Sequence, residues 1–200
     1  MSSGALRCLV LGREASGESH LLLTLLEPSD GILRCLARAS RRAGATQPDL
    51  FDEAEVTFER ASGGANRFVK EYRPLRRQPG IGRSHTALDR ASRLAGVIRR
   101  NPPPPESAAV AFEIVRETLA AMAERPRPDA AYLKALWLLL KDGGWPVEAH
   151  WLARLGTRRE MAAGVLSQPL DAQLADTTAV AELATDLERW AVGEVHYVMP

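Results

Sequence analysis

The chain has 200 residues, of which 46% are hydrophobic, and its formal net charge is +1. A chain of this length and composition forms one ordinary domain or two small ones and can bury a core without disulfides. No run approaches the roughly 18 apolar residues of a membrane span, and the first four residues do not start a leader, so we expect neither membrane spanning nor secretion. The two cysteines, Cys8 and Cys35, are too few for a zinc ribbon or a disulfide framework, and we expect both to be reduced core residues.

The first part of the chain has the short period of β-strands. Five apolar or β-branched runs, bounded by Gly, Ser, Pro and Asp, predict strands over Leu6–Leu11, His20–Leu26, Ile32–Arg38, Ala54–Glu59 and Arg67–Tyr72. A turn with Gly31, which can take the positive φ of a tight reversal, joins the second and third strands. Five short strands cannot cover both faces of an open sheet, so we expect them to close into a small barrel.

After Arg73 the apolar residues recur at helical spacing. Ser84 is predicted to cap a helix that runs through Ile98 and is stopped by the four prolines at 102–105. Further helices are predicted over Glu106–Glu124, over Ala130–Lys141 with Asp129 as the cap, over Val147–Leu155, after a capping box at Thr157–Glu160, and over Thr178–Val192 with Asp176 as the cap. The predicted fold class is therefore α+β, with a five-stranded barrel over residues 1–78 and an all-helical domain over residues 79–200.

The charge is distributed very unevenly along the chain. Residues 67–100 contain nine arginines and one lysine against Glu71 and Asp89, a net charge of +8, whereas residues 1–66 carry −2 and residues 101–200 carry −5. A segment this basic favours an anionic partner. Because it spans the fifth strand, the linker and the first helix, we expect the basic surface to continue from the barrel onto the helices.

Two basic clusters border the predicted barrel and are the candidate phosphate contacts. The first cluster is Arg34, Arg38, Arg41 and Arg42, and the second is Arg67, Lys70, Arg73, Arg76 and Arg77. A small barrel with a basic groove is a recurrent platform for single-stranded nucleic acid, because guanidinium groups neutralise phosphates and aromatic rings stack on bases. Phe68 and Tyr72 are the candidate stacking residues. The alternative for both clusters is a solvated basic face without a partner.

Other motifs give weaker signals. The segment Ser16–His20 contains hydroxyls, a carboxylate and an imidazole, but it leads into a strand and lacks the strand-to-helix turn of a nucleophile elbow, so we interpret it as a polar loop. The four histidines lie far apart without ligand spacing, and we expect no metal, no cofactor and no enzymatic activity. In the helical part, Trp137 has the spacing of a core residue. Together with Lys134 and Lys141 on the same predicted helix, it is also a candidate surface for an acidic partner peptide.

Four motifs follow one another in the barrel segment: the run LVLGREASGESHLLLTLL from Leu9, a turn with Gly31, the run LARASRR from Leu36, and a Gln-Pro pair at Gln47 before an acidic strand. In this order they resemble the RecO family of bacterial recombination mediators. The residues that match the family's pattern are Glu18, Ser19, Gly31, Arg38 and Arg42. The order and spacing of these motifs match over most of the chain.

The resemblance implies an oligonucleotide-binding (OB) type barrel followed by a helical domain. It also implies a cytoplasmic, nucleoid-associated protein that is not an enzyme, binds single- and double-stranded DNA, and anneals complementary strands. With RecR, such a protein helps RecA to replace single-strand-binding protein on DNA. An RNA-binding barrel and a protein-interaction scaffold remain open as alternatives, since the residues alone do not distinguish DNA from RNA.

Two departures from the family's pattern accompany the resemblance. Ala39 stands where the family's basic motif usually has glycine. No cysteine follows Cys35, so the zinc module that many members insert after a helix ending like Asp142–Pro146 is missing, as it is in zinc-free members.

Overall fold

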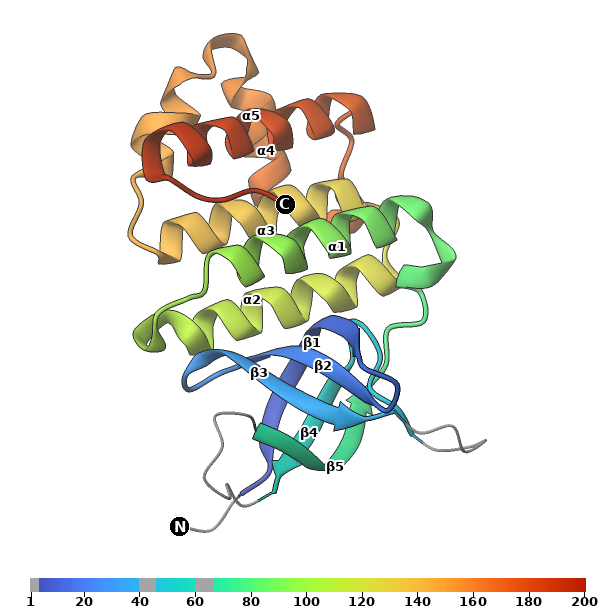
Figure 1. Cartoon of the computed structure of the whole chain (residues 1–200). Coiled ribbons are helices and arrows are strands. Elements are labelled where there is room, and N and C mark those ends of the chain that lie inside the picture. Colours follow the sequence, from blue (N-terminus) through green and yellow to red (C-terminus); the bar gives the residue numbers. More distant parts are fainter. Residues whose placement is uncertain (1–3, 40–45, 60–66) are drawn as a thin grey trace. The chain divides into compact units, whose positions relative to one another are not determined.

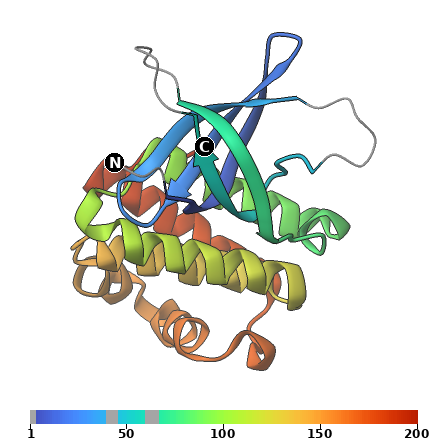
Figure 2. The ribbon, with the colours of Figure 1, turned by 90° about the horizontal axis from the view of Figure 1, so that it is seen from below.

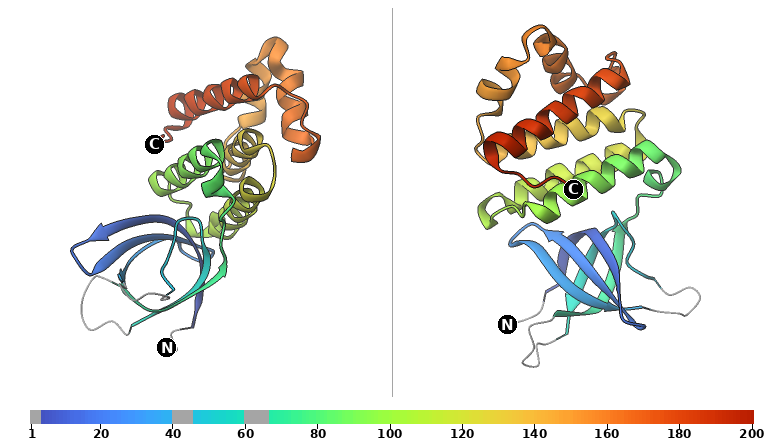
Figure 3. Two further views of the ribbon diagram at one scale, coloured as in Figure 1. Left: turned by 90° about the vertical axis from the view of Figure 1, so that its right-hand side faces the viewer. Right: turned by 45° about the horizontal axis from the view of Figure 1, so that its top comes forward.

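The computed structural model describes residues 4–39, 46–59 and 67–200. Its strands are β1 (Leu6–Ser16), β2 (His20–Glu27), β3 (Gly31–Arg38), β4 (Glu53–Phe58) and β5 (Arg67–Arg76) (Figure 1). They close into a barrel in the order β1-β2-β3-β5-β4, and Figure 3 shows the strands curling round on themselves. All neighbouring strands are antiparallel except β3 and β5, which run parallel. The predicted fold class, a five-stranded OB-like barrel followed by helices, is confirmed.

Two strands, β1 and β5, are longer than predicted by four or more residues. β1 continues to Ser16 and forms a long hairpin with β2 (Figure 2), in which Ser16 lies opposite His20. β5 continues to Arg76, because it stays paired with β4 as far as Glu53. Both extensions are largely exposed, so they are held by pairing with a neighbouring strand and not by a buried apolar face of their own.

The barrel interior is filled by side chains that alternate along the strands. Its buried members are Cys8, Val10, Leu21, Leu23, Leu25, Cys35, Ala37, Ala54 and Val56. The prediction that both cysteines are reduced core residues is confirmed, since both are free and buried. Gly31 has a φ of +83° at the start of β3, as its turn requires.

The chain divides into two compact units. One comprises Met1–Gln78 and Pro102–Phe112, and the other comprises Pro79–Asn101 and Glu113–Pro200. The barrel unit thus includes the segment Pro102–Phe112, which contains the four prolines. At the end of this segment, the Arg7 guanidinium lies over the ring of Phe112, 5.5 Å from the ring centre. A cut after residue 78 would therefore remove part of this unit.

The helices are α1 (His85–Arg100), α2 (Pro105–Glu124), α3 (Pro128–Asp142), α4 (Arg159–Ser167) and α5 (Thr177–Val195). Short helical turns lie between them at Ile81–Arg83, Glu148–Leu152, Gly156–Arg158 and Leu170–Ala172. α3 packs against both α1 and α5. None of the helices in the described part of the chain is both long enough and apolar enough to cross a membrane.

Two predicted caps are confirmed and two are wrong. The Ser84 hydroxyl accepts a hydrogen bond from the first turn of α1, and the Asp176 carboxylate accepts two from the first turn of α5. Asp129 does not cap α3, because a proline with its preset φ starts that helix one residue earlier, and its carboxylate binds the Arg127 guanidinium instead. Thr157 does not cap α4 either, since it lies within a 3-10 turn that leads directly into that helix.

Candidate nucleic-acid interface

The outer face of β2 and β3 carries two arginines of the first basic cluster, Arg34 and Arg38. Along β3, Cys35 and Ala37 point into the barrel, so Arg34, Leu36 and Arg38 point outward, and both arginines are exposed. In the pairing of β2 with β3, Arg34 lies opposite a threonine and Arg38 opposite a histidine. The neighbours of both guanidinium groups on the adjacent strand are therefore not acids.

An aromatic pair lies at the end of this face. His20, opposite Arg38, begins β2, and Phe68, next to Leu36 in the parallel pairing, is near the start of β5. Their ring centroids are 6.1 Å apart and the ring planes make an angle of 74°. Phe68 is 37% exposed, and the Ser19 hydroxyl lies 2.9 Å from Nδ1 of His20. Sequence reasoning proposed Phe68 but missed His20, because only the hairpin register brings them together.

Three arginines of the two basic clusters have no acidic partner among the residues that the structure describes. Within residues 4–39, 46–59 and 67–200, Arg34, Arg38 and Arg67 form no ion pair. Arg67 lies opposite Cys35 in the β3–β5 pairing, so its side chain leaves β5 on the interior side of the sheet, and at the first residue of that strand it is exposed. Burial raises the pKa of the Cys35 thiol to about 12, and the positive charge of Arg67 opposes that shift. These three guanidinium groups are available to an external anion.

The second cluster is largely neutralised by acids from β4 and β5. Arg73 lies opposite Glu55, and its Nε and Nη2 donate to the Glu55 carboxylate. Lys70 lies 3.8 Å from the carboxylate of Glu71. Arg76 is half-buried opposite Glu53, the first residue of β4, and is not without an interaction partner. The run of positive charge in the sequence is therefore broken up by cross-strand pairing.

Asp52 ties the last arginine of the second cluster and the tyrosine into the barrel. The Tyr72 hydroxyl donates to Asp52 at 2.7 Å, and Arg77 lies 3.4 Å from the same oxygen and donates to the Gln47 carbonyl at 3.2 Å. Burial raises the pKa of Asp52, while the bond from Tyr72 and the charge of Arg77 oppose that shift. Since Tyr72 also packs against the barrel interior, its ring supports the fold, and Phe68 is the exposed aromatic residue of β5.

Two residues of the first cluster, Arg41 and Arg42, lie outside the described residues.

The candidate peptide surface on α3 is occupied by contacts within the helical unit. Lys134 donates to the carbonyl of Gln168, and burial lowers its pKa. The Lys141 ammonium lies 4.8 Å from the centre of the Trp137 ring and 2.8 Å from the carboxylate of Glu148. Each lysine therefore already has a partner inside the helical unit.

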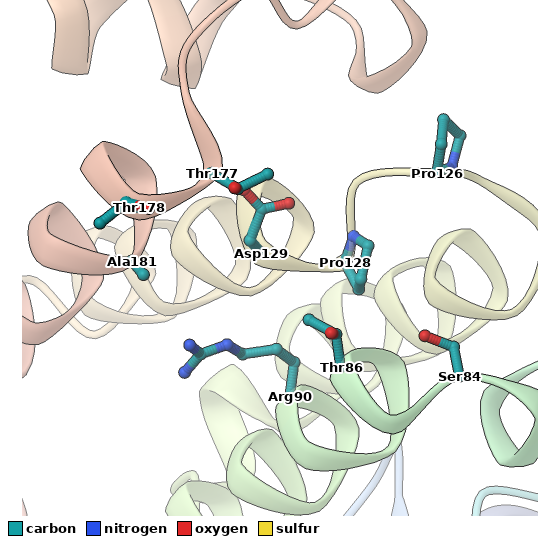
Figure 4. A pocket seen from close by; sticks show the side chains of 9 residues that line it. All are labelled: Ser84, Thr86, Arg90, Pro126, Pro128, Asp129, Thr177, Thr178 and Ala181. Carbon is teal, nitrogen blue, oxygen red and sulfur yellow. The ribbon is translucent and has the colours of Figure 1, made fainter.

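The helical unit also contains a pocket of about 460 Å³, which is shown in Figure 4. Its lining comes from the N-terminal ends of α1, α3 and α5 and from the residues just before them, and consists of Ser84, Thr86, Arg90, Pro126, Pro128, Asp129, Thr177, Thr178 and Ala181. The Arg90 guanidinium lies over the Tyr132 ring and 3.7 Å from Asp89, and Asp129 is paired with Arg127. The charged groups of the lining are thus engaged in packing the helices.

No cluster of three or more His, Cys, Asp or Glu side chains suited to a metal ion occurs in the described part of the chain. Comparison with known protein families finds no matching family model, and comparison with curated proteins finds no match. The assignment of function therefore depends on the barrel face and on the motifs that resemble the RecO family.

Proposed function

We propose that this protein is a non-enzymatic nucleic-acid-binding protein that uses the outer face of β2 and β3 to hold a phosphate backbone. The observation that carries the proposal is the contrast among the arginines of the two basic clusters. Arg34 and Arg38 on this face, and Arg67 at the adjoining start of β5, are exposed without acidic partners in the described residues, near the exposed ring of Phe68, whereas Arg73 is paired. Unneutralised guanidinium groups next to an aromatic ring suit an anionic polymer that carries bases.

The resemblance to the RecO family makes the proposal more specific. Glu18 and Ser19 are in the turn between β1 and β2, Gly31 starts β3 and Arg38 ends it, so the matching residues that the structure describes lie at the ends of barrel strands. On this basis we propose a cytoplasmic, nucleoid-associated mediator that binds single- and double-stranded DNA and, with RecR, helps to load RecA on DNA coated with single-strand-binding protein. Neutralised phosphates repel each other less, which would favour annealing of complementary strands.

The proposal is tested by titrating the full chain into labelled single-stranded DNA, duplex DNA and RNA of equal length at several salt concentrations. Three to five phosphate contacts, counting Arg41 and Arg42, predict a slope of log K against log salt of about −2 to −3.5 on single strands, at about −0.7 per contact. A flat salt dependence would contradict the proposal. Tighter binding to RNA than to both forms of DNA would replace DNA with RNA as the ligand.

A matched pair of variants identifies the face. Each phosphate contact contributes about fivefold in affinity at about 0.1 M salt, so the triple change of Arg34, Arg38 and Arg67 to alanine should weaken binding about 100-fold and make the slope shallower by about 2. Arg73→Ala removes the same charge as any one of those substitutions, but from an arginine that already has an acidic partner. It should change affinity about twofold at most, since its partner already offsets its charge. If Arg73→Ala reduces the slope as much as Arg38→Ala does, the proposed face is wrong.

A further inference from the structure

Three strand ends meet beside the basic face of the barrel. β2 begins with His20, β3 ends with Arg38 opposite it, and β5 begins next to Leu36 with Arg67 and Phe68. Paired residues on neighbouring strands have Cβ atoms about 5 Å apart. A phosphate held by Arg38 would therefore have its base within reach of the two aromatic rings.

The two rings form a corner and not a closed stack. With the ring planes at 74° to each other, a flat group that lies on one ring presents its edge to the other. Phe68 is 37% exposed, so part of this residue remains open to solvent beside the imidazole. The Ser19 hydroxyl occupies Nδ1 of His20, and within the described residues Nε2 has no partner, which leaves it to bond to the edge of a base.

We infer that His20 and Phe68 form a subsite for one unstacked base, so that this face prefers single strands to duplex. The inference rests on the proposed function, because it requires that the face bind nucleic acid. A base in a duplex is stacked on both faces and cannot lie on a side chain, whereas a base of a single strand can. The arginines contact phosphates in either form, so the selectivity comes from the aromatic pair.

The test compares two probes, a labelled thymidine oligomer of about 15 nucleotides, within the range that one such barrel covers, and a duplex of the same length. Phe68→Ala in the full chain should weaken binding to the single strand by about fivefold to 100-fold and binding to the duplex by less than about twofold. Phe68→Leu should behave like Phe68→Ala, because an aliphatic side chain keeps the apolar bulk but offers no ring to a base. Leu75→Ala, at an exposed aliphatic position on the same strand, should change neither affinity.

Two further variants define the pair. His20→Ala should weaken single-strand binding, and the double variant with Phe68→Ala should lose less than the product of the two single losses, since one base contacts both rings. Phe68→Trp should bind the single strand. The emission of the new tryptophan is the difference in fluorescence between this variant and the parent chain. It should be quenched by the single strand but not by the duplex.

The outcomes separate the inference from the proposed function. If Arg38→Ala weakens binding to both probes while Phe68→Leu binds the single strand like the parent protein, the basic face is correct and the base subsite is wrong. Equal losses on the two probes with Phe68→Ala would also overturn the subsite. If the parent protein binds neither probe at low salt, the proposed function and the inference both fail.

Discussion

Replacing Glu188 with glutamine tests whether one carboxylate joins three helices of the helical unit. Glu188 lies on α5, and its side chain is only 8% exposed. It accepts hydrogen bonds from Nε and Nη2 of Arg93 on α1 at 2.5 and 2.6 Å, and from the Tyr132 hydroxyl on α3 at 2.7 Å. Arg93 belongs to the segment with a net charge of +8, yet the structure uses it inside this unit. Glutamine keeps the shape of the side chain and removes its charge.

The expected loss of stability is about 2 to 3 kcal/mol. Removing one partner of a buried ion pair costs about 3 to 5 kcal/mol. The Arg93 side chain is 33% exposed, so water compensates part of that loss. In a chain of 200 residues, each kcal/mol lowers the melting temperature by about 2 to 4 °C, so Glu188→Gln should lower it by about 5 to 10 °C.

The loss should depend on pH in a defined direction. Burial alone would raise the pKa of Glu188, but the hydrogen bonds from Arg93 and Tyr132 outweigh it and lower the pKa below its ordinary value of 4.5. The folded state therefore binds fewer protons than the unfolded state in that range, and the carboxylate stabilises the fold above pH 4.5. This contribution is lost as the pH falls through the folded-state pKa.

Thermal unfolding followed by circular dichroism, from about pH 7 to about pH 3, measures both effects. The gap in melting temperature between the parent chain and Glu188→Gln should narrow steadily at acid pH. Glu182→Gln removes the same charge from an exposed position on α5 and should melt like the parent chain. A gap that is absent at neutral pH, or that keeps its size below the ordinary glutamate pKa, would refute a stabilising role for the ionised carboxylate.

Two more predictions concern the barrel unit. Burial raises the pKa of Cys8 and Cys35 to about 12, so a thiol reagent at neutral pH should modify neither in the folded protein and both after unfolding; rapid modification before unfolding would contradict their burial. Gly31→Ala should cost more stability than Gly17→Ala in denaturant unfolding, because a Cβ at position 31 would lie 2.8 Å from the Pro103 carbonyl oxygen, whereas position 17 has open space. Both glycines have positive φ, so we expect about 1 to 2 kcal/mol at position 17 from backbone strain alone, and equal losses at the two positions would show that the contact is unimportant.

Features with a local physical cause were predictable from the sequence. The five strands follow from alternation of apolar residues, and the caps at Ser84 and Asp176 follow from side-chain oxygens placed just before an apolar helical face. The wrong prediction of an Asp129 cap also has a local cause. Proline is favoured at the first position of a helix, so α3 starts at Pro128 and Asp129 lies inside it. The predicted cap at Thr157 is wrong because the spacing of a capping box does not show whether the same residues form a 3-10 turn.

Features that depend on strand register were not predictable. Charge counts along the chain made residues 67–100 the most basic segment, and they could not show which side chains face an acid. The strand register determines which arginines face an acid, because Arg73 on β5 lies opposite Glu55 on β4, whereas Arg38 on β3 lies opposite His20. Two arginines of equal charge therefore differ in what they can offer a phosphate.

The same register explains why the barrel face combines cations with an aromatic pair. A shift of β2 by one residue in its pairing would turn His20 into the barrel, away from Phe68. The same shift would expose the leucines that now fill the interior. Burial of Leu21, Leu23 and Leu25 thus also determines where the imidazole points. In this barrel, packing of the core and presentation of the proposed binding face are consequences of one pairing of β2 with β3.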